Sequence, residues 1–178
     1  MISFQKFSLR NKNISVLKFI SNYFYVGYDD GILQKFTEDF HLLFQKKIHP
    51  CILFNIYQLD TCFVTFSLSE TCLWDFNWNQ KKKFLNVLFH RICPLHEEKI
   101  IFGSISGDLF SWNQKELIPL PYHFHRPSIT HLLKINKKQF LSYNPTKLIL
   151  WEKEEKKNVK KKEKDWISTI EIFDKEHI

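Results

Sequence analysis

The sequence predicts an all-β fold built from four similar units, and three observations lead to that prediction. The 178-residue chain contains no alanine, so the strongest helix former is absent. Aromatic anchors recur at Phe36, Trp74, Trp112 and Trp151, with spacings of 38, 38 and 39 residues. Each anchor closes the same strand–turn–strand pattern, and a constant period of this length is typical of repeat architectures.

Each unit begins with two short apolar segments that we expect to be strands. The expected first strands are 16–20, 52–57, 91–95 and 131–135, and the expected second strands are 23–28, 62–66, 99–104 and 139–143. Turn residues follow in three units, as Asp29-Asp30-Gly31, Ser106-Gly107 and Asn144-Pro145, whereas Leu68-Ser69-Glu70 is a weaker turn.

The third strand of each unit ends at the anchor, and a polar link leads to a fourth strand. We expect these fourth strands at 42–47, 83–88 and 115–120. Four strands in roughly 40 residues correspond to one blade of a β-propeller. The prediction is therefore a single domain, 1–178, with units of about 14–49, 50–90, 91–128 and 129–173 and a charged loop at 152–165.

The anchors also resemble the signature of the WD-repeat family. Trp74-Asp75 is the signature dipeptide, while Trp112-Asn113, Trp151-Glu152 and the degenerate Phe36-Thr37 are related to it. The Gly-His that normally ends the outer strand is reduced to a histidine, at His49, His90 and His125. The chain is thus similar to a short, divergent member of this family over residues 14–152.

The resemblance implies a WD-repeat-like β-propeller or partial propeller of about four four-stranded blades. It also implies the family's Asp–His–Ser–Trp hydrogen-bond network, although not in every unit, because the Gly-His and the turn Asp are inconsistent here. The alternative is another all-β fold, such as a sandwich, in which the anchors are ordinary core residues.

Four units are fewer than the seven that are usual in the family. A compact four-bladed ring could close by itself, or an open arc could pair with a second copy or with another protein. Apolar residues at Ile2, Phe4, Phe7 and Leu9 and in the segment 166–173 suggest strands that complete or cap the outer units. We therefore expect self-association or a partner rather than a monomer.

The net charge of +7 is carried mainly by lysine, since only three of the 26 basic residues are arginine. Two lysine clusters are candidate contacts for a polyanion or a nuclear-import receptor: Lys81, Lys82, Lys83, and Lys156, Lys157, Lys160, Lys161, Lys162, Lys164. The other interpretation is that both clusters lie in solvated loops. Scarce arginine argues against reading of base edges.

Motifs for catalysis or metal binding are missing from the sequence. The four cysteines form no Cys-x-x-Cys pair and are expected to be reduced core residues. His123 and His125 lack a further ligand nearby, and Gly103–Gly107 falls where the repeat requires a hairpin. We therefore expect no catalytic residue, no metal and no cofactor.

Neither a secretory leader nor a membrane-spanning segment is expected. The function we predict is a non-enzymatic protein-interaction scaffold, a WD-repeat-like subunit of an intracellular complex in the nucleus or cytoplasm, with other protein subunits as partners. The alternative is a ribonucleoprotein or ribosome-assembly subunit that contacts RNA phosphates through the lysine clusters. A hydrolase built on a propeller is a third, weaker hypothesis.

Overall fold

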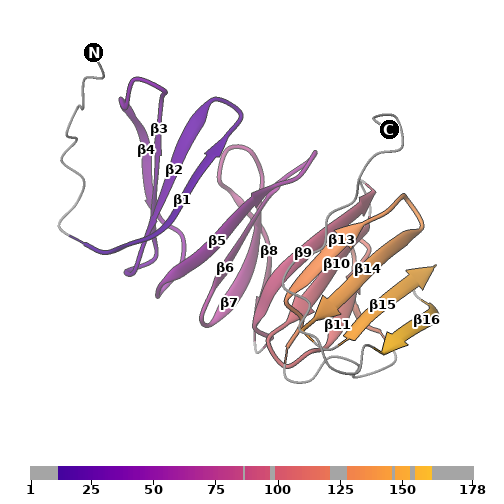
Figure 1. Ribbon diagram of the computed structural model, residues 1–178. Coiled ribbons are helices and arrows are strands. Elements are labelled where there is room, and N and C mark those ends of the chain that lie inside the picture. The colour runs from indigo at the N-terminus through magenta and orange to yellow at the C-terminus, as the bar shows by residue number, and fades with distance from the viewer. Residues whose placement is uncertain are drawn as a thin grey trace, which may run out of the picture. The chain divides into compact units, whose positions relative to one another are not determined.

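The computed structural model describes residues 12–85, 87–96, 99–120, 128–145, 147–152 and 155–161. Every element in these ranges is a β-strand (Figure 1), so the all-β prediction is confirmed. In the same ranges, no helix has the length and apolar character needed to cross a membrane.

In the described part of the chain, sixteen strands form four antiparallel sheets, each with four strands in sequential order. Sheet 1 contains β1 (Ile14–Ile20), β2 (Tyr23–Tyr28), β3 (Ile32–Phe36) and β4 (Leu42–Lys47). Sheet 2 contains β5 (Leu53–Gln58), β6 (Phe63–Ser67), β7 (Glu70–Trp74) and β8 (Gln80–Leu85). Sheet 3 contains β9 (Phe89–His96), β10 (Lys99–Ser104), β11 (Leu109–Trp112) and β12 (Leu117–Pro119). Sheet 4 contains β13 (His131–Lys134), β14 (Gln139–Asn144), β15 (Lys147–Glu152) and β16 (Glu155–Lys161).

The strands fall into two compact units, where the sequence predicted one domain. The first unit contains sheets 1 and 2, and the second contains sheets 3 and 4. Each unit is described by itself below.

The four anchors occupy equivalent register positions on the third strand of each sheet. Each pairs with an apolar residue of the second strand, in the pairs Phe36 with Phe24, Trp74 with Phe63, Trp112 with Ile100, and Trp151 with Phe140. All four anchors are buried. The spacing of 38 or 39 residues therefore corresponds to one complete four-stranded sheet.

We call the face of a sheet that carries its anchor the anchor face, and the other side the opposite face. In the first unit, Trp74 and Ile56 on the anchor face of sheet 2 share a buried cluster with Tyr25 and Leu33 on the opposite face of sheet 1. In the second unit the same relationship joins the anchor face of sheet 4 to the opposite face of sheet 3. Trp151, Leu132, Ile101 and Leu109 lie in that cluster. Burial of these side chains is the main contribution to the stability of each unit.

Two predicted loops are strands in the structure. Lys81 and Lys82 lie within β8, which begins at Gln80, so they do not form the blade-edge loop that the charge run suggested. Lys83 was expected to begin the fourth strand at 83–88, and it lies within β8 as well. The predicted charged loop 152–165 is also wrong over its centre, because Glu155–Lys161 is β16, the fourth strand of sheet 4. Lysine is common on edge strands because its charge discourages pairing with other chains, and this explains a strand of such composition. The apolar residues at positions 2–9 and 166–173 lie outside the described residues.

Candidate functional site: a buried hydrogen-bond network in sheet 2

The most connected polar group in the described chain links the anchor of sheet 2 to a turn and to a preceding loop. The indole Nε1 of Trp74 donates to Oγ1 of Thr65 across 2.7 Å. The same hydroxyl lies 2.7 Å from Nε2 of His49, and Nδ1 of His49 lies 3.0 Å from Oε1 of Glu70. Lys83 completes the group, with its ammonium 2.8 Å from Oε2 of Glu70.

The chemistry of the groups fixes the direction of each bond. Burial raises the pKa of Glu70, but hydrogen bonds from Lys83 and His49 outweigh burial and lower the pKa overall, so the carboxylate is ionised and only accepts. His49 therefore donates from Nδ1. Burial lowers the pKa of His49 more than Glu70 raises it, so the imidazole is neutral and Nε2 accepts the hydroxyl hydrogen of Thr65. Every side-chain polar atom of this network therefore has a partner.

Short turns and a glycine bring these side chains together. Thr65 lies in β6, Glu70 begins β7 and Trp74 ends it, so one hairpin presents three members of the network. His49 comes from the loop after β4, whose backbone is fixed by bonds from the Ile48 and His49 N–H groups to the carbonyl of Gly31 at 3.0 and 3.2 Å. Gly31 has φ +79°, and a Cβ there would lie 2.2 Å from the carbonyl oxygen of His49. Only glycine permits this approach.

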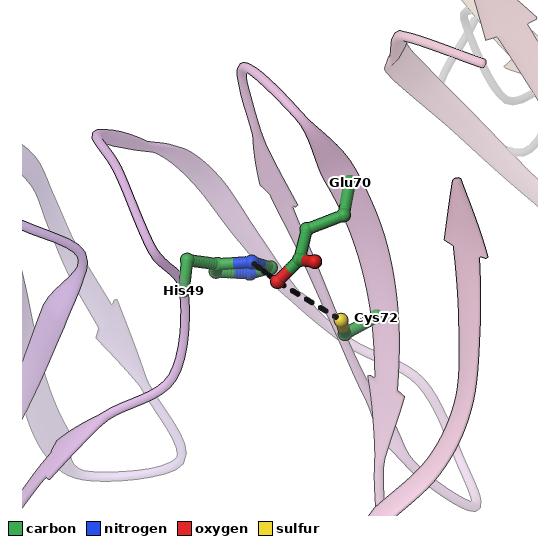
Figure 2. A group of neighbouring side chains, drawn as sticks. All are labelled: His49, Glu70 and Cys72. Atoms are coloured by element: carbon green, nitrogen blue, oxygen red, sulfur yellow. Dashed lines mark hydrogen bonds and ion pairs between the residues drawn. The ribbon is translucent and has the colours of Figure 1, made fainter. Parts of the chain in front are cut away.

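His49, Glu70 and Cys72 form the one group of three potential metal ligands in the part of the chain that the structure describes, with ligand atoms within 4.8 Å of one another (Figure 2). The donor set does not fit a metal ion. Both His49 nitrogens and both Glu70 oxygens already have partners. Burial raises the pKa of Cys72 to about 12, so the thiol keeps its proton. The Lys83 ammonium supplies the positive charge that a metal would otherwise bring.

Thr65, His49 and Glu70 also have the order of a hydroxyl–imidazole–carboxylate triad, which activates a nucleophile in many hydrolases. All three side chains are buried, so a substrate carbonyl has no route to the hydroxyl. The Thr65 oxygen additionally accepts the indole hydrogen of Trp74, which occupies the space where a reacting atom would have to sit. The network therefore has a structural role: it connects the loop after β4 and the β6–β7 turn to strands β6 and β7.

The network is only partly repeated in the other sheets. The residue two positions after the anchor's partner is Thr65 in sheet 2 and Ser142 in sheet 4, and Trp151 donates to Ser142 at 2.7 Å. Val26 and Phe102 occupy this position in sheets 1 and 3 and have no hydroxyl. His90 lies in β9, and His125 lies outside the described residues, as do His123, Lys162 and Lys164.

Sequence analysis missed Thr65, Ser142 and Glu70 as members of this site. The signal was available: a hydroxyl recurs at a fixed offset from two of the anchors, and an acid stands in the turn that was considered weak. Glu70 also explains that turn, since Oγ of Ser67 accepts from the Glu70 N–H at 3.1 Å and donates to its carbonyl at 3.0 Å.

The residue after the anchor has a separate role in three sheets. Oδ1 of Asp75 accepts from the backbone N–H of Asn77 at 2.9 Å and of Asn79 at 2.8 Å, which closes the loop between β7 and β8. In the equivalent loops, the Thr37 hydroxyl accepts from the His41 N–H, and Oδ1 of Asn113 accepts from the Glu116 N–H, each at 3.0 Å. The second residue of the dipeptide is therefore a loop cap.

Most of the lysines in the two clusters lie on strands. Lys81 and Lys82 are exposed on β8, whereas Lys83 is committed to Glu70. Lys156, Lys157, Lys160 and Lys161 lie on β16. The described lysines of the two clusters therefore belong to the fourth strands of sheets 2 and 4.

Comparisons with solved structures show the fold that this chain shares with other proteins. It matches the crystal structure of the computationally designed Ika8 protein with a TM-score of 0.62 and 14% identity, over 80% of this chain and 46% of that one. It matches the computationally designed Ika4 protein with a TM-score of 0.66 and 14% identity, over 83% of this chain and 95% of that one. The chain thus spans about half the length of the Ika8 chain and nearly all of the Ika4 chain. No family model matches the sequence. No curated protein matches it.

Proposed function

We propose that this protein is a WD-repeat-like β-propeller or partial propeller that acts as a non-enzymatic scaffold for other protein subunits of an intracellular complex. The observation that carries the proposal is the chain of hydrogen bonds from Trp74 through Thr65 and His49 to Glu70. It has the order of the Trp–Ser–His–Asp network that the resemblance implies, with Thr in place of Ser and Glu in place of Asp.

The repeated architecture supports the same proposal. Four consecutive sheets have identical strand order, and their anchors share one register. A blade of the propeller class consists of four antiparallel strands in sequential order.

A scaffold role is favoured over catalysis by where polar and apolar side chains lie. The acid, imidazole and hydroxyl that could perform chemistry are buried and mutually bonded. Large hydrophobic side chains, by contrast, reach the surface: of the thirteen exposed ones among the described residues, ten (Ile14 to Leu85) lie in the first unit. Exposed apolar groups mark protein-interaction surfaces where they form a contiguous patch, and we propose that some of those in the first unit do so.

Co-purification from native cells, followed by mass spectrometry, tests the scaffold proposal. We expect a reproducible set of partners with the natural chain and their loss with Phe76→Asp, a change at a half-exposed loop residue of the first unit. Ile118→Asp, at an exposed residue of the second unit, is the matched control. Recovery of the chain alone, under conditions that preserve complexes, would contradict the proposal.

The alternative, an RNA-contacting subunit, has weaker support. The exposed Lys81 and Lys82 could contact phosphates, but Lys83 is bound to Glu70. Fewer lysines of this cluster can therefore contact RNA. Titration of binding to a single-stranded RNA against salt separates the two functions. Phosphate contacts produce a steep fall in affinity between 50 and 200 mM salt, about 300-fold for six contacts on a single strand. A scaffold that binds through apolar surface shows no such RNA binding.

A further inference from the structure

One register position on the first strands carries different chemistry in the two units. The residue at this position pairs with the third residue after the anchor's partner. It is Val16 in sheet 1, Asn55 in sheet 2, Arg91 in sheet 3 and His131 in sheet 4. The first unit therefore has uncharged residues at this position, and the second unit has two basic residues.

The two basic residues lie close together because their strands are neighbours. β9 and β13 lie side by side in the second unit (Figure 1). Nε of Arg91 donates to the backbone carbonyl of Thr130, the residue that precedes His131. The imidazole of His131 is exposed and stacks on the ring of Tyr143, with centroids 4.9 Å apart and an interplanar angle of 10°. The repeat thus brings together one basic side chain from each of two adjacent sheets.

Backbone carbonyls hold the guanidinium of Arg91 in place. Besides the bond to Thr130, Nη1 of Arg91 donates to the carbonyl of His90 at 2.9 Å. His90 is the extra residue of a bulge in β9, since Phe89 and Arg91 pair with consecutive residues of β10. A guanidinium has five N–H donors, so three of them have no partner among the described residues.

Carboxylates are missing around this pair in the described part of the chain. The strands β9, β10, β13 and β14 contain no Asp or Glu, and their remaining ionisable residues are His90, Cys93, His96, Lys99, Lys134 and Tyr143. Burial and the charge of Arg91 lower the pKa of both His131 and His90, and no carboxylate opposes this effect. The charge of Arg91 is therefore not balanced by an acid on these strands.

The sequence shows the same imbalance over a longer stretch. Between Glu116 and Glu152 the chain contains four lysines, one arginine and three histidines, and no Asp or Glu. Removing a cation from water without a counter-charge is costly, and Arg91 is half-buried. An anion bound beside Arg91 would remove this cost.

We propose that Arg91 and His131 bind a phosphate monoester, with the remaining guanidinium N–H groups and the protonated imidazole donating to its oxygens. Arginine is the residue that best matches phosphate geometry. A monoester carries a charge of about −1.5 to −2 at pH 7, which the two basic side chains together balance. A carboxylate carries one negative charge, which Arg91 alone would balance. This inference is independent of the scaffold role.

An NMR titration of the purified full chain at pH 6.5 tests the site, with the signals of the His131 imidazole and the Arg91 side chain as readouts. We expect saturable shifts with inorganic phosphate and at least about tenfold weaker binding of acetate at equal ionic strength. Phosphoserine with blocked termini is the second phosphate probe. Tighter binding of phosphoserine assigns the site to a phosphorylated side chain of a protein, and tighter or equal binding of inorganic phosphate assigns it to a small phosphate ester.

Two substitutions that remove the same charge separate the site from general electrostatic attraction. Arg91→Gln should weaken phosphate binding by at least about tenfold. Lys134→Gln, at an exposed residue on the same strand as His131, should weaken it by less than about twofold, because an exposed charge outside the site is screened. If circular dichroism shows that Arg91→Gln does not fold, His131→Gln at the exposed position takes its place.

The pH dependence of sulfate binding tests the role of His131. Sulfate keeps two negative charges at every pH used, so a change in its affinity reports protonation of the protein. The natural chain should bind sulfate at least about threefold more tightly at pH 6 than at pH 8, because the bound dianion favours the protonated imidazole. His131→Gln should bind sulfate more weakly at pH 6 and lose most of this dependence.

Three outcomes would overturn the inference. They are the absence of saturable shifts with phosphate at tens of millimolar, acetate that binds as tightly as phosphate, and a Lys134→Gln chain that loses as much affinity as Arg91→Gln. These measurements use the purified chain and small anions alone. Their failure would therefore leave the co-purification test of the scaffold proposal unaffected.

Discussion

Trp74 and Thr65 are joined by a 2.7 Å hydrogen bond that crosses from the third strand of sheet 2 to the second, and Trp151 and Ser142 repeat it at the same distance in sheet 4. The bond gives a buried indole N–H its acceptor where the aromatic ring fills the core. In sheet 2 the acceptor is shared with His49, so one hydroxyl connects the core to the loop after β4.

Replacing Thr65 with Val should lower the free energy of unfolding by about 2–4 kcal/mol, because both the Trp74 indole and His49 Nε2 lose their partner while remaining buried. Thr65→Ser keeps the hydroxyl and should cost below about 1.5 kcal/mol, for one lost methyl group. Urea unfolding of both variants measures the difference. A Ser variant that loses more stability than the Val variant would show that the methyl group, rather than the hydrogen bonds, is what the position contributes.

The stability of the protein should decrease as the pH falls below the ordinary histidine pKa of 6.5. Burial lowers the pKa of His49 in the folded chain, so in this range the unfolded chain binds more protons and is stabilised relative to the folded chain. The pKa values of His90 and His131 are lowered as well and act with the same sign. His49→Gln should therefore show a smaller loss of stability between pH 7 and pH 5 than the natural chain. Identical slopes for the two proteins would exclude His49 as a source of the pH dependence.

Asp75 should matter through its loop and not through a buried charge. Its carboxylate is exposed, and hydrogen bonds from Asn79 hold its pKa below the ordinary value. Asp75→Ala removes the acceptor for the Asn77 and Asn79 N–H groups, and we expect a lower thermal midpoint. Asp75→Asn should retain most of the stability, because Asn113 already performs the same task between β11 and β12. An Asn variant as unstable as the Ala variant would contradict the loop-cap role.

The fold was predictable because the residues that define the repeat of 38 or 39 positions are large, buried side chains. Anchors at constant spacing, with apolar strands on either side, mark the second and third strand of every sheet. The fourth strands were less predictable, because β8 and β16 are lysine-rich edge strands of small apolar content. The strand expected at 83–88 begins three residues earlier, at Gln80, and β16 lies where a loop was expected.

The site was predictable only in part, for a different reason. His49 and Trp74 carry a recognisable signature, whereas Thr65 and Glu70 are ordinary residue types that become important through register and through a turn of the right length. The cation that balances Glu70, Lys83, comes from a strand that was expected at 83–88, but nothing in the sequence paired it with Glu70. Lys83 is a structural residue because its ammonium lies 2.8 Å from Glu70 across the β7–β8 hairpin, and the composition of β8 does not show this.

The anchor of sheet 4 should be as important as that of sheet 2. Trp151 is fully buried, stacks on Phe140 with ring centroids 5.7 Å apart, and donates to Ser142. Trp151→Ala should cost about 3–5 kcal/mol through the cavity and the lost bond. Trp151→Phe, which keeps much of the ring volume, should cost distinctly less in the same urea titration. An Ala variant within about 1 kcal/mol of the natural chain would contradict a core role for the anchor.

Adjacent lysines on β8 should respond differently to the same substitution. Lys83→Gln removes the ammonium that lies 2.8 Å from the buried carboxylate of Glu70, which then keeps only His49 as a partner. The Lys83 side chain is itself 37% exposed, so water screens the ion pair. We therefore expect the free energy of unfolding to fall by about 1–2 kcal/mol, which is less than the cost of breaking a fully buried pair. Lys82→Gln, one residue earlier on the other side of the strand, should change the free energy of unfolding by less than about 0.5 kcal/mol.

Urea midpoints of the two variants at pH 7 provide the comparison. Repeating the measurement at 0.5 M NaCl should reduce the difference between the two midpoints, since salt screens the partly exposed ion pair. Equal stability of the two variants would show that Glu70 is held by His49 alone, and the lysines of β8 would then form one exposed cluster, as the sequence first suggested.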